Sequence, residues 1–84
     1  MVHFTLYSRS YCHLCGDMLE ALQALSSEFP FAVEIIDVDL DESLVSQFDE
    51  LVPVLTAQRN QSEPVQICNY FFDESKVRAF LTNI

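Results

Sequence analysis

The sequence predicts one α/β domain, residues 1–84, in which helices cover both faces of a four-stranded mixed sheet and give three layers, α/β/α. Three observations lead to this prediction. In the first half of the chain, apolar runs of strand length alternate with segments of helical periodicity, as in a βαβ unit. Two further strand-length runs follow, joined by a short polar loop. An amphipathic helical pattern then ends the chain, so the expected order is β-α-β-α-β-β-α.

The first strand is predicted at His3–Tyr7, where apolar and polar residues alternate. The first helix is predicted from about Cys12 to Ser27, with Ser10 or Tyr11 near its N-cap. Its apolar stripe consists of Leu14, Met18, Ala21, Leu22, Leu25 and Phe29, and Pro30 lies just beyond its end. The only glycine, Gly16, costs about 1 kcal/mol relative to alanine inside a helix, which indicates close packing or local looseness at that position.

The second strand is predicted at Val33–Val38, which is largely apolar on both faces, with Glu34 and Asp37 as its charged residues, and so suits a strand buried between two layers. A short helix is expected next, capped by Asp41. Leu44, Val45 and Phe48 are expected to face the core from this helix.

The second half of the chain predicts a hairpin followed by a helix. Its strands are expected at Val52–Ala57 and Pro64–Asn69, joined by the polar turn Gln58–Glu63. Asp73 is expected to cap the last helix. That helix directs Val77, Phe80, Leu81 and Ile84 toward the core.

Composition narrows the classes of partner. Thirteen acidic residues against four basic ones give a net charge of −9, so phosphate backbones and anionic membranes would be repelled, and we expect neither nucleic acid nor a membrane as partner. No signal peptide or membrane-length apolar run is visible, so a reducing cytoplasm is expected. Three cysteines are an odd number and too few for the disulfide framework of a small secreted domain.

Cys12 and Cys15 stand three residues apart at the start of the first predicted helix, directly after a strand and a short turn. A helix N-terminus offers unpaired N–H groups and partial positive charge, and both stabilise a thiolate, the reactive form of cysteine. Arg9 adds to this effect, whereas Asp17 and the acidic surface oppose it. Cys15 lies one turn further along the same helix face, close enough to attack a mixed disulfide on Cys12. The pattern therefore predicts a thiol–disulfide redox site with Cys12 as nucleophile and Cys15 as resolving thiol.

With these motifs the chain resembles the thioredoxin fold in its minimal, glutaredoxin-like form, and in particular small bacterial proteins with a Cys-His-Leu-Cys site. The segment Tyr7–Cys15 and the Val52-Pro53-Val54-Leu55 stretch carry the resemblance. The sequence departs from that of glutaredoxins in the inner pair of the motif, His13-Leu14, where glutaredoxins commonly have Pro-Tyr. It also departs at 69–72, Asn-Tyr-Phe-Phe, where glutaredoxins usually have a Gly-Gly pair.

The resemblance implies a dithiol–disulfide oxidoreductase that acts on protein disulfides or glutathione mixed disulfides. Such an enzyme needs no bound cofactor, and glutathione could serve as its co-substrate. A monomer is the default for this fold. The resemblance also implies that Arg9 contacts an anionic substrate group, and that Val52 and a cis-Pro53 present backbone to an extended substrate. Tyr11 would flank the site, and His13, when protonated, would stabilise the Cys12 thiolate.

Two alternatives remain open at the level of sequence. The cysteine pair could supply half of a zinc or iron–sulfur site, with Cys68, His3 or His13 as further ligands, although a second CxxC is absent. The fold could also serve as a non-catalytic adaptor that binds a protein through its groove or acidic face. Cys68 is otherwise interpreted as a small buried hydrophobe and His3 as structural.

Overall fold

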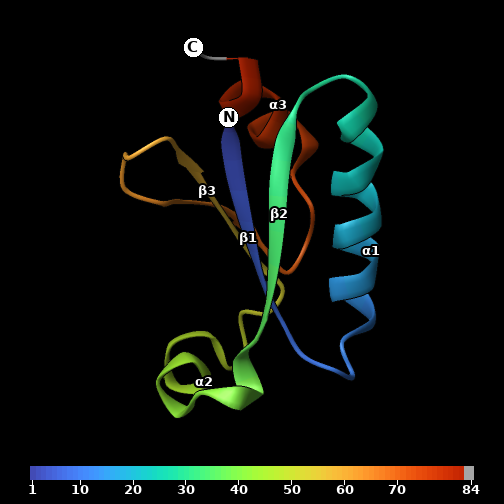
Figure 1. Ribbon diagram of the computed structural model, residues 1–84. Coiled ribbons are helices and arrows are strands. Elements are labelled where there is room, and N and C mark those ends of the chain that lie inside the picture. Colours follow the sequence, from blue (N-terminus) through green and yellow to red (C-terminus); the bar gives the residue numbers. More distant parts are fainter. Residues whose placement is uncertain (83–84) are drawn as a thin grey trace.

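The computed structural model describes residues 1–82 of the chain. At its centre is β1 (Val2–Ser8), which pairs in parallel with β2 (Phe31–Asp37) and antiparallel with β3 (Val54–Arg59). On the far side of β3 lies β4 (Val65–Asn69), also antiparallel, so the strand order is β2-β1-β3-β4 (Figure 1). The four-stranded mixed sheet confirms the predicted α/β class.

Helical segments connect and follow these strands. The first is α1 (His13–Gln23), which tightens into the 3-10 helix η1 (Ala24–Ser27). A 3-10 turn, η2 (Val38–Leu40), leads into the short helix α2 (Glu42–Phe48), and α3 (Glu74–Thr82) comes last. In Figure 1, α1 runs alongside the sheet, and α2 sits at the end of the sheet where β2 finishes.

The main core lies on the sheet face that carries Phe4 and Leu6, both of which are buried. Since side chains alternate along a strand, these two point to the same face. From α1 and α3, Leu22 and Val77 pack onto this face. The cluster is completed by Met18, Leu25, Leu55, Ala57, Ile67 and Cys68.

A second, smaller cluster lies on the opposite face of the sheet. Val38, Phe48 and Val54 are buried there, and the rings of Tyr7 and Phe48 lie 4.6 Å apart. The rest of this face carries the polar side chains of His3, Thr5, Glu34, Thr56 and Gln58, none of which is buried. The third layer formed by α2 is therefore confined to one end of the sheet.

A bulge interrupts the pairing of β3 with β4. Leu55 pairs with Cys68, whereas Thr56 pairs with Gln66, so Ile67 is an extra residue on β4. Alternation would send Ile67 and Cys68 to opposite faces, but both are buried in the main core. The bulge thus supplies two consecutive core side chains from one short strand.

Several boundaries differ from those predicted. The third strand begins at Val54 rather than Val52, because Pro53 has no N–H with which to join the ladder. It continues through Arg59, since Gln58 and Arg59 pair with His3 and Val2 and shorten the predicted polar turn. The regular α-helix ends at Gln23, and the last turn of the predicted helix is 3-10.

The predicted caps of the two later helices are confirmed. The Asp41 carboxylate accepts from the Ser43 N–H at 2.8 Å, and the Asp73 carboxylate accepts from the Lys76 N–H at 3.1 Å. The predicted core residues of the last helix are confirmed for Val77, Phe80 and Leu81, whereas Ile84 lies outside the described residues. Within residues 1–82, no helix has the length and apolar character needed to cross a membrane.

Leu22→Ala tests the main core. The side chain is fully buried, so its truncation should lower the free energy of unfolding by about 2–5 kcal/mol, a large part of the stability of so small a domain. The exposed Leu40 is the matched control, and Leu40→Ala should cost less than about 0.5 kcal/mol. Urea unfolding of both variants measures the difference, and equal costs would contradict the assigned core.

Candidate active site

The sulfur atoms of Cys12 and Cys15 lie at disulfide distance, with the two Cα atoms 5.1 Å apart. Both cysteines sit where the chain leaves β1 and enters α1. Their exposure differs: Cys12 is half-buried, whereas Cys15 is only 4% exposed. A reagent from solvent therefore reaches the Cys12 sulfur more easily, as the predicted roles require.

Cys12 is itself the N-cap of α1. Its backbone is extended, and its Sγ accepts a hydrogen bond from the Cys15 N–H at 3.1 Å. The Gly16 N–H donates to the Cys12 carbonyl at 3.4 Å. The prediction of Ser10 or Tyr11 near the cap is therefore wrong, because the sulfur occupies the place that a serine or aspartate oxygen usually takes. In the reduced protein the Cys15 N–H would face the Cys12 thiolate.

Gly16 follows the cysteine pair on α1. A Cβ built on it meets nothing within 4 Å, so close packing does not explain the glycine. The residue is exposed, and the surface beside the cysteine pair is open there.

Arg9 lies in the loop before Cys12, and its carbonyl accepts from the Cys12 N–H at 3.2 Å. Its guanidinium is paired with Asp39 at 3.1 Å and with Asp49 at 3.0 Å. The side chain thus fastens the active-site loop to the η2–α2 region. Two carboxylates already neutralise the positive charge that was expected to favour the thiolate and an anionic substrate group.

Tyr11 and His13 flank Cys12 on the outside of the molecule. The Tyr11 residue is 95% exposed. The His13 ring is exposed as well, and its Nε2 lies 3.6 Å from an Asp17 carboxylate oxygen one turn further along α1. Both side chains are exposed to solvent beside Cys12, and among the described residues neither contacts the disulfide through a hydrogen bond.

The Val52–Pro53 peptide bond is cis, and Pro53 is buried. The Val52 N–H donates to the Phe48 carbonyl at 3.2 Å, so this donor is already used within the free protein. On the other side, the Pro53 carbonyl accepts from the Tyr70 N–H at 2.7 Å. Within residues 1–82, no backbone hydrogen bond ends on the Val52 carbonyl.

Strand register brings these segments to one end of the sheet. Tyr7, five residues before Cys12, pairs with Val54, and Val54 pairs with Asn69. The cysteine loop, the Val52–Pro53 pair and the turn after β4 therefore adjoin one another. All five substrate-binding residues predicted from sequence belong to the first two of these segments.

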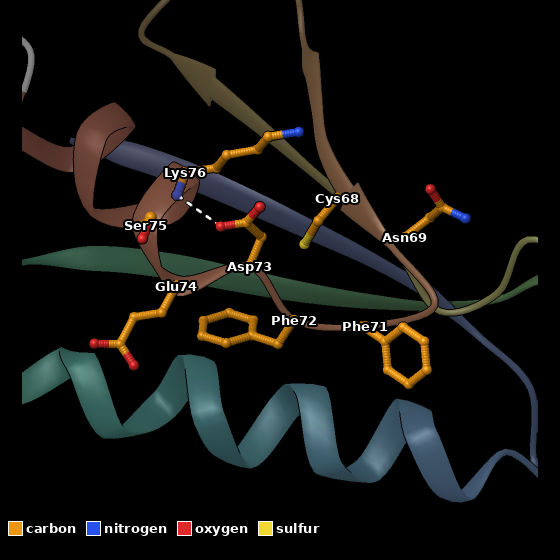
Figure 2. A pocket seen from close by; sticks show the side chains of 8 residues that line it. All are labelled: Cys68, Asn69, Phe71, Phe72, Asp73, Glu74, Ser75 and Lys76. Atoms are coloured by element: carbon orange, nitrogen blue, oxygen red, sulfur yellow. Dashed lines mark hydrogen bonds between the residues drawn. The ribbon is translucent and has the colours of Figure 1, made fainter.

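Cys68, the free cysteine among the described residues, lies away from the pair. It lines a hollow of about 400 Å³ at the N-terminal end of α3. Figure 2 shows its side chain near that of Asp73. Burial raises the pKa of the Cys68 thiol, and the nearby Asp73 carboxylate raises it further, against a hydrogen bond from the Asp73 backbone. The prediction of a small buried hydrophobe is confirmed, and the raised pKa favours the protonated form of this thiol over the reactive thiolate.

The ligand set proposed for a metal is not assembled in one chain. His3 lies at the opposite end of β1 from the cysteine pair, and Cys68 is buried beside α3. Among residues 1–82, no three His, Cys, Asp or Glu side chains group as metal ligands do. The cysteine pair alone would provide half of a tetrahedral site.

Tyr70 and Phe71 are residues at this end of the sheet that sequence reasoning did not assign to the site. Both are exposed and follow β4 directly, next to Pro53. The signal that could have revealed them was two aromatic residues directly after a strand and outside the apolar stripe of the next helix.

Comparison with known proteins agrees with this geometry. Residues 3–82 match the family model described as Glutaredoxin-like domain (DUF836), and the chain belongs to this glutaredoxin-like family of the thioredoxin fold. The structure is similar to that of protein Ne2328 from Nitrosomonas europaea, with 33% identity, a TM-score of 0.82 and coverage of 96% of this chain and 92% of that one.

Two further solved structures extend the comparison. Target protein XcR50 from X. campestris is 30% identical, with a TM-score of 0.62 and coverage of 96% of this chain and 97% of that one. Fasciola hepatica thioredoxin is 19% identical, with a TM-score of 0.70 and coverage of 98% and 79%, and it shows the shared fold alone. The comparison with curated proteins gave no match.

The difference between the two kinds of thiol can be measured by alkylation. In the reduced, folded protein, Cys68 should react with iodoacetamide at least about tenfold more slowly than Cys12, because its pKa is raised and its sulfur is buried. Mass spectrometry of timed, acid-quenched samples gives the order of labelling. Urea should abolish the difference, and rapid labelling of Cys68 in the folded protein would contradict its assignment as inert.

Proposed function

We propose that the protein is a dithiol–disulfide oxidoreductase that reduces protein disulfides or glutathione mixed disulfides. The observation that carries the proposal is the asymmetric pair at the start of α1, with an accessible Cys12 capping the helix and a buried Cys15 at disulfide distance. A reducing compartment such as the cytoplasm suits this activity. The protein would act as a monomer without a bound cofactor.

The reaction begins with both cysteines reduced. The Cys12 thiolate attacks one sulfur of the substrate disulfide, forms a mixed disulfide and releases the other substrate sulfur, which takes a proton from solvent. The Cys15 thiolate then attacks the Cys12 sulfur and releases the second substrate thiol. Two electrons have passed to the substrate, and Cys12 and Cys15 are left as a disulfide. A dithiol protein or two molecules of glutathione would return the pair to the reduced state.

The local structure supports each step. The Cys15 N–H, 3.1 Å from the Cys12 sulfur, is placed to stabilise the Cys12 thiolate before it attacks the substrate. Burial of Cys15 protects it from external disulfides while Cys12 is free. The free Val52 carbonyl and the exposed Tyr11 border the path by which a substrate strand would approach.

Cys15→Ser tests the division of roles. Without a resolving thiol, the mixed disulfide on Cys12 should persist, so this variant should accumulate covalent adducts with a disulfide substrate, detectable by mass spectrometry and non-reducing gels. Cys12→Ser is the matched control and should accumulate few, because Cys15 is buried. Equal trapping by both variants would overturn the assignment of nucleophile and resolving thiol.

A redox titration in glutathione buffers tests the couple itself. Cys12 and Cys15 should convert together as one two-electron couple, with a midpoint between about −270 and −120 mV, the range found on closely similar scaffolds. Cys68 should remain free throughout. Thiol labelling and mass spectrometry give the fractions. A pair that never closes, or that is masked until a chelator removes metal, would replace the redox assignment with a metal site.

A further inference from the structure

Tyr70 and Phe71 form an exposed aromatic pair directly after β4. They are 47% and 68% exposed, and their rings meet edge to face with centroids 4.7 Å apart. The next residue, Phe72, packs instead against the main core. The fold therefore packs one aromatic residue of this turn partly into the core and leaves two exposed, where large apolar side chains contribute little to folding.

The backbone of Tyr70 gives a second, independent observation. Its φ is 68°, in the left-handed region that glycine adopts without cost and that costs other residues roughly 1–2 kcal/mol. The ring is not buried in the core, so its packing does not offset the cost of this backbone conformation. Folding alone therefore does not account for a tyrosine here. Strain of this kind at a surface residue points to a role in binding.

The aromatic pair lies beside the cysteine site. The Tyr70 N–H donates to the carbonyl of Pro53, and the preceding Asn69 pairs with Val54. In Figure 2, Phe71 lies over the N-terminal part of α1, the part that follows Cys12. Together with the exposed Tyr11, the aromatic rings of Tyr70 and Phe71 border the Cys12 end of the molecule.

Charge decides what could dock there. Residues 10–58 contain no lysine or arginine. An acidic segment, residues 37–50, carries Asp37, Asp39, Asp41, Glu42, Asp49 and Glu50. Arg9 ties the cysteine loop to this segment, and Figure 1 places α2 at the same end of the sheet as the loop that leads into α1. The resulting field attracts cations and repels glutathione, which carries more carboxylates than ammonium groups.

We propose that Tyr70, Phe71 and Tyr11 form a docking surface for an extended, positively charged segment of a disulfide-bearing protein, and that this surface selects such substrates over glutathione disulfide. The inference rests on the proposed oxidoreductase function and specifies its substrate class. The aromatic rings would hold the segment by apolar contact, and the acidic segment would steer its lysine or arginine residues.

Single-turnover oxidation of the reduced protein tests the proposal. Four probes are used: a disulfide-bonded peptide with lysines around its cysteines, the same peptide with glutamates in their place, glutathione disulfide, and the neutral bis(2-hydroxyethyl) disulfide. Closure of the Cys12–Cys15 disulfide is followed by acid quench, alkylation and mass spectrometry. At an ionic strength of about 0.01 M, the lysine peptide should oxidise the protein at least about tenfold faster than the glutamate peptide and glutathione disulfide do. This ratio of rates should decrease at an ionic strength of about 0.15 M.

The variant Tyr70→Gly/Phe71→Ser removes both rings and relieves the left-handed strain, so it is expected to fold. Its rate with the lysine peptide, relative to its rate with the neutral disulfide, should fall about tenfold. Val65→Ser, which truncates an exposed apolar residue at the other end of β4, is the control and should leave that ratio unchanged.

The outcomes separate the two proposals. If the neutral disulfide oxidises the wild-type pair but the double variant keeps the wild-type ratio, or the glutamate peptide reacts as fast as the lysine peptide, the docking surface is refuted and the oxidoreductase function stands. If the wild-type pair is oxidised by none of the four probes, the oxidoreductase function falls and the docking surface falls with it.

Discussion

The two ladders formed by β1 set the position of every residue at the candidate active site. Its parallel pairing with β2 and its antiparallel pairing with β3 both include Tyr7, and the chain leaves the sheet one residue later toward Cys12. Because β3 runs in the opposite direction, its start, and with it Pro53, falls beside the end of β1. The bond from the Tyr70 N–H to the Pro53 carbonyl then extends the arrangement to the turn after β4. A slip of one residue in the β1–β3 register would turn Val54 to the wrong face and move Pro53 away from the cysteines.

The electrostatics of the site follow from which charges are free and which are paired. The N-terminus of α1 provides a fixed favourable contribution to the Cys12 thiolate through the Cys15 N–H. The Arg9 guanidinium is paired with the Asp39 and Asp49 carboxylates, so it fastens the cysteine loop more than it stabilises the Cys12 thiolate. The surrounding surface remains strongly acidic. In the proposed function, chemistry at Cys12 and selection of its substrates would therefore depend on different groups. Backbone N–H would serve the chemistry, and side-chain charge with exposed aromatic rings would serve the selection.

Much of the fold was predictable because its signals are local. The caps Asp41 and Asp73 and the core residues Val77 and Phe80 follow from residue type and helical period, and they lie where expected. Errors arose where the chemistry of a single residue or a tertiary contact overrode the pattern of alternation and period. Val52 has strand propensity, but Pro53 delays the ladder, and Gln58 and Arg59 are polar yet complete it by pairing with β1. Ser10 has the chemistry of an N-cap, but Cys12 occupies the cap once its sulfur meets the Cys15 N–H.

The sequence by itself determined the class of fold and the cysteine pair, since spacing of three at a helix start and alternation in a strand are properties of neighbouring residues. Only the tertiary structure decided that Arg9 is neutralised by carboxylates 30 and 40 residues away, that a bulge buries both Ile67 and Cys68, and that Tyr70 and Phe71 stand exposed beside Pro53. These facts depend on contacts between segments distant along the chain. Such contacts are fixed by sheet register and packing, which no local pattern specifies.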